Sequence, residues 1–549
     1  MTGVRRRSLV FTSPHPDVEI PDLSVYDTLF GGIASSDLDR IALRDGTSGA
    51  ETSYRQLISQ INALAGALAA AGIGIGDVVA LHAPNVPAFA TVFHGILRAG
   101  ATATTVNGLY NAEEIEAQLL DAGATMVFTV SALLPQAWAA ASACDIPSDR
   151  VVVLDGAEGH ASLTDLLVRR LPAPDVSFDP ATHVAVLPYS SGTTGRPKGV
   201  MLSHRNLVAN VQQSIPQLGM RPDDRILAVL PFFHIYGMTV LLNLALACRA
   251  SLVTMPRFDL AEFLRIIQDF RCSYVFIAPP IAVALAKHPL VDEFDLSSVH
   301  TIFSGAAPLD ATLGRAVEER LDCRLRQGYG MTELSPVSHA IAFQAEGASL
   351  DSVGTSLPNM RCRIVDPETG VEVEYPAAGS DEESAPGELL CAGPNVMLGY
   401  LGNEEATRAT LEDDGFLHTG DIATVRGDGT VRIIERLKEL IKYHGYQVAP
   451  AELEALLLGH PAIADAAVIG VSDEDGQEVP KAFIVLQAGQ DVTSEALMAW
   501  VAERVAPHKK IRRVEVVEVI PKSTSGKILR KDLRAAEALR QAQGPVAAQ

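Results

Sequence analysis

Apolar and polar residues follow two different periods in the first part of the chain. Between residues 54 and 71 apolar side chains recur three or four positions apart, which predicts an amphipathic helix. The short apolar run at 77–83 then predicts a buried strand. The alternation continues, with helices expected near 88–97 and at 112–121 and strands at 102–106 and 125–130. This order of strand and helix is typical of parallel sheets that are covered by helices.

The middle of the chain continues this alternation. The segment HVAVLPY at 183–189 is short and rich in valine, which predicts another buried strand. A loop of Ser, Thr and Gly follows it, and a helical pattern begins after Ser203. Four more strands are expected, at 225–233, 251–255, 274–280 and 300–305.

The pattern changes near Gly354. Shorter β-like segments follow, at 361–366 and 387–393, and the acidic, Ala-, Pro- and Gly-rich residues between them predict a solvent loop. After Arg436 a compact α/β unit is expected, with helices from 450, near 494–505 and at the basic C-terminus, and strands at 466–470, 481–486 and 514–519. We therefore predict an α/β protein with a large N-terminal domain of parallel-rich sheets flanked by helices plus a β-subdomain, at 1–436, and a small α+β C-terminal domain, at 437–549.

Composition and charge narrow the class of protein. A chain of 549 residues that is 48% hydrophobic and 20% charged is expected to be globular and to hold more than one domain. Its net charge of −22 argues against nucleic acid or an anionic membrane as the main partner. The six cysteines form no C-x-x-C pair, and no apolar run has the length of a signal core or a membrane span. A cytoplasmic protein with reduced thiols and no stable membrane insertion is the expectation.

Candidate chemistry begins with the segment YSSGTTGRPKGVMLSHRNL at 189–207. A loop of small residues between a strand and a helix lets backbone N–H groups converge on a phosphate, and Lys198 adds a positive charge. The segment is not a Walker A loop, because Pro197 stands where the second glycine belongs. On the residues alone, a hydrophilic surface loop is an equally good interpretation. The similar-looking GIGIGD at 72–77 follows a helix and precedes a strand, so we interpret it as a turn and not as a dinucleotide motif.

Six further segments complete a pattern that covers nearly the whole chain. They are PFFHIYG (231–237), SGAAPL (304–309), QGYGMTELSPV (327–337), DGFLHTGD (414–421), ERLKELIKYHGYQVAPAELE (435–454) and IPKSTSGKILRKDL (520–533). In this order they resemble the motifs of the adenylate-forming superfamily of acyl-CoA synthetases, adenylation domains and luciferases. Their sequences are most similar to those of 4-coumarate–CoA ligases. The resemblance implies a ligase that uses ATP, Mg²⁺ and coenzyme A. Such an enzyme converts a carboxylic acid to an acyl-adenylate and then to acyl-CoA, and its mobile C-terminal domain rotates about a hinge at Lys438.

The resemblance also assigns roles in catalysis. Attack of a carboxylate on the α-phosphate of ATP joins two anions, so positive charge is needed as the adenylate forms. The resemblance gives that role to Lys527, although a lysine there would otherwise be read as a solvated surface residue. It assigns Lys442 to the adenylation step and Gln447 to the thioester step. Glu333 is expected to hold Mg²⁺, with the hydroxyls of Thr193 and Thr194 on the metal or the phosphates.

Nucleotide binding is assigned in the same way. Asp421 is expected to accept hydrogen bonds from the ribose hydroxyls and Arg436 to donate to them, while Tyr329 lies against adenine with SGAA (304–307) as the other wall. Many relatives have Asp where this chain has Glu435. The full nucleotide set implied by the resemblance is Ser190, Ser191, Gly192, Thr193, Thr194, Gly195, Lys198, Ala306, Gly328, Tyr329, Gly330, Thr332, Asp421 and Arg436.

The acid substrate is less well defined. His234 matches a family histidine beside the acyl carboxylate, and we favour a positioning role for it over general base catalysis, although a lone histidine is more often structural. PFFHIYG contains no aspartate that could pair with an α-amine, which favours a plain carboxylic acid. The residues implied to line the acyl pocket are Tyr236, Gly237, Ala306, Gly330, Pro336 and Val337. They suit a flat aryl-propenoate, and they also suit a medium- or long-chain fatty acid.

Three other functions compete with a CoA ligase. An adenylating enzyme could load a carrier protein instead of CoA. The sequence of 442–454, which resembles that of CoA ligases, disfavours this function, and so does the expectation that no carrier domain follows residue 549. A luciferase-like oxygenase would need a special acid. A catalytically inactive AMP-binding scaffold is disfavoured by the presence of Lys527, Glu333 and Asp421.

Overall fold

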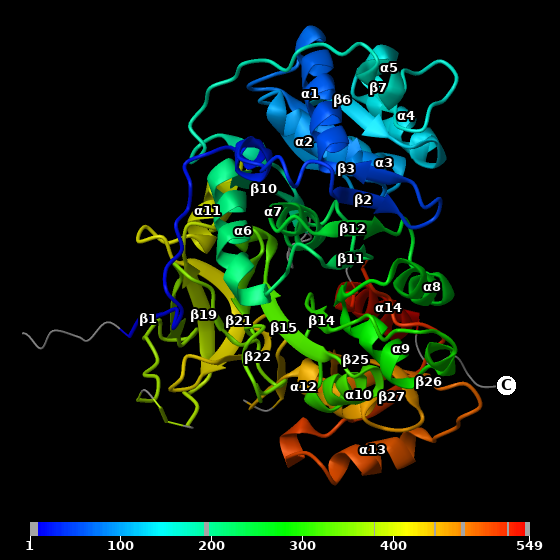
Figure 1. Cartoon of the computed structure of the whole chain (residues 1–549). Coiled ribbons are helices and arrows are strands. Elements are labelled where there is room, and N and C mark those ends of the chain that lie inside the picture. The colour runs from blue at the N-terminus through cyan, green and yellow to red at the C-terminus, as the bar shows by residue number, and fades with distance from the viewer. Residues whose placement is uncertain are drawn as a thin grey trace, which may run out of the picture.

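Two mixed sheets with parallel strands at their centres form the larger part of the molecule (Figure 1). The computed structural model describes residues 9–190, 197–377, 379–380, 382–443, 446–473, 478–523 and 526–543. The predicted α/β class, with a large N-terminal part and a small C-terminal part, is confirmed.

The first sheet has the strand order β20-β10-β8-β5-β4-β6-β7. Its strands are β4 (Val78–His82), β5 (Thr102–Thr105), β6 (Ala124–Thr129), β7 (Val151–Val153), β8 (Val184–Val186), β10 (Lys198–Ser203) and β20 (Gly399–Tyr400), and the short β9 (Tyr189–Ser190) pairs with β10. The strands β8, β5, β4, β6 and β7 run parallel, whereas at one edge β10 is antiparallel to β8 and β20 is antiparallel to β10.

Helices connect and cover the first sheet. They are α1 (Tyr54–Ala70), α2 (Pro87–Arg98), α3 (Ala112–Ala122), α4 (Leu134–Ala143) and α5 (Leu163–Leu167). The first of them begins at a capping box, because Ser53 accepts from Gln56 N and Gln56 accepts from Ser53 N. Its apolar stripe is buried, and a side chain at Gly95 of α2 would lie only 2.6 Å from Leu64. The 3.6-residue period therefore places the apolar stripe of α1 in the interior, and the absence of a side chain at Gly95 allows α2 to pack closely against it.

The second sheet has the order β17-β16-β15-β14-β13-β11-β12-β2-β3. Its strands are β2 (Ile41–Asp45), β3 (Glu51–Ser53), β11 (Arg225–Ala228), β12 (Ser251–Thr254), β13 (Tyr274–Ile277), β14 (Thr301–Ser304), β15 (Arg324–Gly330), β16 (Val337–Ala340) and β17 (Thr355–Ser356). The accompanying helices are α6 (His204–Leu218), α7 (Leu244–Ala247), α8 (Leu260–Phe270), α9 (Pro279–Lys287) and α10 (Ala311–Leu321). One large hydrophobic core joins both sheets and includes Phe89, Phe232 and Phe276.

Three sequence-based expectations for this region need correction. The strand β11 ends at Ala228 and not at 233, because Asn85 binds the carbonyl oxygens of Ala228 and Leu230 and draws the chain out of the sheet. The strand β13 ends at Ile277, since proline at 279 opens a helix. The phosphate loop also does not run from a strand directly into a helix, because β10 lies between the loop and α6.

The third sheet is antiparallel throughout. Its order is β1 (Phe11–Thr12), β18 (Arg361–Val365), β19 (Gly387–Ala392), β21 (Leu417–Val425) and β22 (Val431–Arg436), and α11 (Glu404–Thr410) precedes β21. It forms the curved yellow layer beside the second sheet in Figure 1 and confirms the change of pattern that the sequence shows after Gly354.

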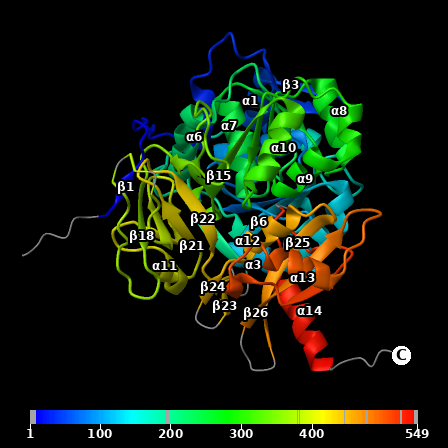
Figure 2. The same cartoon turned by 90° about the horizontal axis from the view of Figure 1, so that it is seen from below.

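The C-terminal residues form a separate small unit (Figures 1 and 2). It contains β23 (Ile441–Tyr443), β24 (Tyr446–Val448), α12 (Pro450–Leu458), β25 (Ile463–Ser472), β26 (Glu478–Leu486), α13 (Ser494–Ala502), β27 (Arg513–Val516) and α14 (Arg530–Gln543). Lys287 of α9 donates to the carbonyl of Leu458, 3.0 Å away, and so holds the unit against the second sheet. The domain boundary at 436–437 stays a prediction, since Ile422, Leu440 and Ala449 form one small hydrophobic cluster across it.

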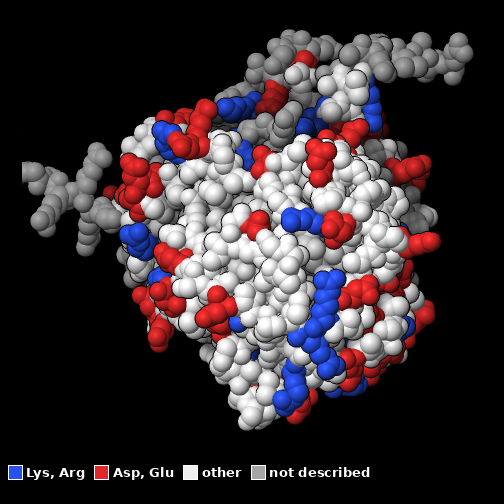
Figure 3. Space-filling model, turned by 90° about the horizontal axis from the view of Figure 1, so that it is seen from above, with Lys and Arg blue, Asp and Glu red and all other residues white. Residues whose placement is uncertain are grey.

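On the face shown in Figure 3 the centre is largely uncharged, acidic side chains lie around much of the rim, and a short stripe of basic side chains crosses the lower part. Within the part of the chain that the structure describes, no helix combines the length and the apolar character needed to cross a bilayer.

Candidate functional site

The segment 231–237 lies where the carboxyl ends of strands from both parallel sheets meet. Asn85, which follows β4, donates to the carbonyls at the end of β11 and accepts from Phe232 N at 2.7 Å. Thr105 of β5 donates to the carbonyl of Phe233 at 2.7 Å. Ligand sites of α/β proteins form at such strand ends. Asn85 and Thr105 were not predicted, because their role depends on contacts with residues more than a hundred positions away.

This anchored segment determines the state of His234. The N–H of Tyr236 donates to His234 Nδ1 at 3.3 Å, which leaves the proton of a neutral imidazole on Nε2. Burial, helped by the nearby charge of Lys527, lowers the pKa of His234 to about 3. A neutral ring with a proton on Nε2 can donate a hydrogen bond but cannot accept a proton there. The geometry therefore favours the positioning role over the general base.

Asp421 and its neighbours form a buried group that contains the residues assigned to the nucleoside from the sequence. Asp421 is 4% exposed, accepts a hydrogen bond of 2.5 Å from the hydroxyl of Tyr329, and lies 3.4 Å from Arg436 Nε. Burial raises the pKa of Asp421, while Arg436, Tyr329 and Lys527 oppose the rise. These contacts bring together the three residues that the sequence assigned to ribose and adenine.

Lys527 reaches this group from the C-terminal unit. Its turn is closed by hydrogen bonds from Gly526 N to the Ser523 carbonyl and from Ser523 N to the Lys527 carbonyl. Gly526 has a φ of +82°, and a side chain there would lie 2.9 Å from Cβ of Ala278, so only glycine lets the turn approach this closely. Burial and the charge of Arg436 lower the pKa of Lys527 to about 8, whereas Asp421 and Glu333 oppose the shift.

Glu333, which the sequence assigned to Mg²⁺ and the ATP phosphates, is 5% exposed. Its Oε1 accepts hydrogen bonds from Ser190 Oγ at 3.2 Å and from the Tyr400 hydroxyl at 2.9 Å. The ammonium of Lys198 lies 4.7 Å from the centre of the Tyr400 ring. Tyr400 was missed from the sequence because its strand, β20, reaches β10 only in the folded sheet.

The carboxylate of Glu333 fits a metal site of a particular kind. Within the described residues, no group of three or more His, Cys, Asp and Glu side chains could hold a metal ion. One buried carboxylate whose second oxygen has no hydrogen-bond partner among the described residues suits Mg²⁺ that is held mainly by phosphate oxygens and water.

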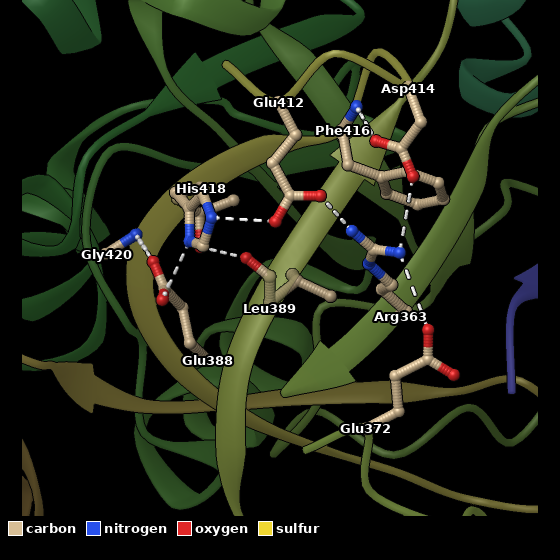
Figure 4. Close-up of polar contacts among 10 residues, drawn as sticks. Arg363, Glu372, Glu388, Leu389, Glu412, Asp414, Phe416, His418 and Gly420 are labelled. Atoms are coloured by element: carbon tan, nitrogen blue, oxygen red, sulfur yellow. Dashed lines mark hydrogen bonds and ion pairs between the residues drawn. The ribbon is translucent and has the colours of Figure 1, made fainter. Parts of the chain in front are cut away.

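A charged network includes residues of β21, the strand that carries Asp421, and of its neighbours (Figure 4). Glu388 accepts from Gly420 N at 3.0 Å and from His418 Nδ1 at 3.0 Å, and the other ring nitrogen of His418 lies 3.0 Å from Glu412. Glu412 also pairs with Arg363, whose guanidinium lies 4.2 Å from the Phe416 ring centre. Hydrogen bonds to Glu388 and Glu412 raise the pKa of His418. The network fixes Gly420 and thereby the backbone next to Asp421.

The predicted acyl residues fall into two groups. A side chain on Gly305 would lie 2.8 Å from the Tyr236 hydroxyl, which places Tyr236 beside SGAA, where Ala306 adopts a left-handed φ of 73°. Gly237 lies against the backbone carbonyl of Pro231. A side chain at 237 would lie 2.1 Å from that carbonyl oxygen, so the position has room only for glycine. The second group is the bend between β15 and β16, where Gly330 pairs with Val337 and lies against the carbonyl of Pro336.

Some predicted residues are placed elsewhere or lie outside the described part of the chain. Lys442 is exposed on β23 and donates its backbone N–H to Glu478 at 2.7 Å, and Lys438 is exposed in the turn after β22. Thr332 begins a short 3₁₀ turn, and Gly328 lies against Phe303. The structure does not describe Ser191, Gly192, Thr193, Thr194 and Gly195, nor the side chain of Gln447. Their predicted roles stay predictions.

Comparisons with known proteins agree with this arrangement. The sequence model described as AMP-binding enzyme matches residues 33–401, and the AMP-binding enzyme C-terminal domain matches 452–527. A 4-coumarate–CoA ligase 5 from Oryza sativa subsp. japonica is 41% identical over 543 residues, which cover 97% of this chain and 98% of the relative. The anthranilate CoA ligase AuaEII in complex with anthranoyl-AMP has 27% identity and a TM-score of 0.86, with 96% of this chain and 99% of the other covered.

A third relative has been solved in two states. MatB from Rhodopseudomonas palustris is 28% identical in both, and each comparison covers 93% of this chain and 98% of the other. Its ATP-bound form gives a TM-score of 0.83 and its apo form 0.74, so this chain is more similar to the ATP-bound form. Together with the match over nearly the full length, this shows that the chain belongs to the AMP-binding enzyme family and is an acid–thiol ligase of the adenylate-forming type.

Proposed function

We propose that this enzyme converts an aryl-propenoic acid of the 4-coumarate class to its CoA thioester in two steps at one site. The observation that carries the proposal is the position of Lys527, which enters from the C-terminal unit. The preceding Gly526 packs against Ala278 just after β13, and the charges of Arg436, Asp421 and Glu333 act on the pKa of Lys527. A lysine in that position suits neutralisation of the anions that react to form an adenylate.

In the first step an oxygen of the substrate carboxylate attacks the α-phosphorus of ATP, and pyrophosphate leaves. Asp421 and Arg436 would hold the ribose, and the ring of Tyr329 would lie against adenine. His234 would donate from Nε2 to the carboxylate and orient it, while the ammonium of Lys527 bridges the carboxylate and the α-phosphate. The donor pattern of His234 and the placement of Lys527 support these roles.

Glu333 would hold Mg²⁺, which supplies charge neutralisation to the phosphates. Its available carboxylate oxygen and the hydroxyl of Ser190 beside it support this assignment. Lys198 would contribute a further positive charge, held in place by the face of Tyr400.

In the second step the thiolate of CoA attacks the carbonyl of the acyl-adenylate, and AMP leaves. We infer that the C-terminal unit rotates about Lys438 between the steps and replaces Lys527 by the β23–β24 hairpin with Gln447. Lys442 lies on the same hairpin, so it would arrive with the second step, although the sequence assigned it to adenylation. Its side chain is exposed, and none of the described contacts joins it to Asp421 or Glu333 in the present arrangement, which supports this inference.

The choice of an aryl acid rests on two observations. The curated relatives at about 40% identity are named 4-coumarate–CoA ligases, and AuaEII holds an aryl acyl-adenylate. In addition, the hydroxyl of Tyr236 is buried and has no hydrogen-bond partner within the described residues, so it is available to a polar group on a substrate ring.

A panel of acids tests the proposal. Pyrophosphate release and CoA thioester formation should be highest with 4-coumarate and its ring-hydroxylated analogues, intermediate with cinnamate and low with hexanoate or palmitate. Higher kcat/KM with a fatty acid would overturn the substrate assignment. Transfer to a holo-carrier protein in preference to free CoA would overturn the acceptor.

A further inference from the structure

Glu435 makes contacts across the predicted domain boundary. It is the residue before Arg436 at the end of β22, and it is 5% exposed. Its Oε1 accepts a hydrogen bond of 2.8 Å from Arg436 N, and its Oε2 accepts one of 2.8 Å from Ala451 N in the first turn of α12. Each carboxylate oxygen therefore has its own backbone N–H donor, one on each side of Lys438.

The contact with Ala451 caps a helix that does not cap itself. The residue before α12 is Ala449, which makes no side-chain cap, and Pro450 at the first position has no N–H to donate. A carboxylate at a helix N-terminus accepts from its free N–H groups and is stabilised by the helix dipole. The carboxylate that caps α12 is that of Glu435, which lies on the sheet that also carries Asp421 and Arg436.

Glu435 is also connected to the segment that carries Lys527. Arg530 lies three residues after Lys527, and its Nη2 approaches Glu435 Oε2 at 3.9 Å. The same guanidinium binds both oxygens of Glu454 on α12, at 2.9 and 2.7 Å. Thus Glu435 contacts α12 directly, while the Arg530–Glu454 pair ties α12 to the SGK turn.

We propose that Glu435 is a positioning residue for adenylate formation, which docks the C-terminal unit through α12 and Arg530 so that Lys527 lies in the site. This rests on the proposed two-step function. Glu435 precedes Lys438, whereas Ala451 and Arg530 follow it, so rotation about Lys438 separates the partners. The contact thus favours the adenylating arrangement alone and has to break before the thioester step.

Glu435→Gln tests the proposal with little change of shape. Glutamine offers one acceptor oxygen to two N–H donors, and its NH₂ group faces one of them, so the docking contact loses a buried bond and its charge. The matched control is Glu537→Gln. Glu537 is also a buried carboxylate, 7% exposed, and pairs with Lys481 at 2.6 Å, but both residues follow Lys438, so their contact moves with the C-terminal unit.

Both variants and the wild type are compared in single-turnover reactions with the most active acid, with quenched samples read for acyl-AMP and acyl-CoA. In Glu435→Gln, acyl-AMP formation should fall about tenfold, the size expected for one buried charge-assisted bond, while conversion of supplied acyl-AMP to acyl-CoA stays within about twofold of wild type or rises. Glu537→Gln should leave the ratio of the two steps unchanged. Thermal unfolding of each variant controls for stability.

The outcomes separate this inference from the function on which it rests. Equal slowing of both steps in Glu435→Gln, or no slowing of either, would overturn the positioning role while leaving a working ligase. A wild-type protein that forms no acyl-AMP from any acid would overturn the proposed function and the role of Glu435 with it.

Discussion

Asp421 and Arg436 stand opposite each other in the antiparallel register of β21 and β22, with 3.4 Å between Asp421 Oδ1 and Arg436 Nε. Residues that face each other across such a ladder project on the same side of the sheet. The pairing therefore places an acceptor and a donor side by side, as the two hydroxyls of a ribose require. Tyr329 contacts the same carboxylate from β15, which adds a ring from a second sheet.

Replacement of Asp421 by alanine should raise KM for ATP by tenfold or more, because a charged hydrogen-bond acceptor is lost. KM for the acid should change much less. Arg432→Ala is the matched control, since Arg432 faces Thr424 on the same two strands but is half-exposed and belongs to no predicted site. Steady-state kinetics with each substrate varied would reveal the difference, and an unchanged ATP dependence would remove Asp421 from the nucleotide site.

Lys527→Ala should reduce formation of acyl-adenylate by roughly 10²-fold or more, since the ammonium neutralises charge that develops only in that step. Conversion of pre-formed acyl-adenylate to thioester should be largely retained. The two half-reactions can be followed separately by pyrophosphate release and by mass spectrometry of the thioester. Equal losses in both would mean that the lysine is structural.

The pKa of Lys527, about 8 in the free enzyme, predicts a pH dependence. The protonated form acts, so kcat/KM for ATP in the adenylation step should be constant below pH 7 and should fall as pH rises through about 8. Lys527→Arg should lose this descending limb, because guanidinium stays protonated across the range. The same limb in wild type and Lys527→Arg would assign the titration to another group.

Tyr236→Phe tests the ring pocket. If the buried hydroxyl binds a 4-hydroxyl group of the substrate, kcat/KM with 4-coumarate should fall about tenfold while the value with cinnamate is unchanged. The ratio of the two substrates in one preparation cancels differences in folding. A uniform loss for both acids would show that the hydroxyl serves packing instead.

Lys438→Pro tests the hinge. None of the described backbone hydrogen bonds uses the N–H of Lys438, so proline should be tolerated in the present arrangement but should restrict φ at 438 and the conformation of Leu437. Adenylate formation should stay within a few-fold of wild type, and thioester formation should fall far more. Quenched single-turnover samples give both rates, and equal slowing of the two would count against alternation of domains.

Local features of the chain were predictable from the sequence because they depend on neighbours in the sequence. The helical spacing of Leu57, Ile61, Leu64 and Leu68 predicted α1 almost to the residue, since a 3.6-residue period is a property of the helix itself. The short apolar runs predicted the parallel strands in the same way, and motif order alone identified the family. Strand ends were less accurate, as β11 shows, because Asn85, in the loop after β4 of the other sheet, binds the carbonyl groups where that strand stops.

The contacts that make a site were decided by the tertiary structure. Nothing near residue 400 in the sequence indicates that Tyr400 binds Glu333, and nothing near 85 indicates that Asn85 holds the His234 segment. The sequence shows that this chain has Glu435 where many relatives have Asp. The contact that Glu435 makes with Ala451 could not be predicted, because it depends on where α12 lies in the folded chain. Sequence spacing specifies which side chains share a face of one element, whereas hydrogen bonds between elements require the distances that only the folded chain provides.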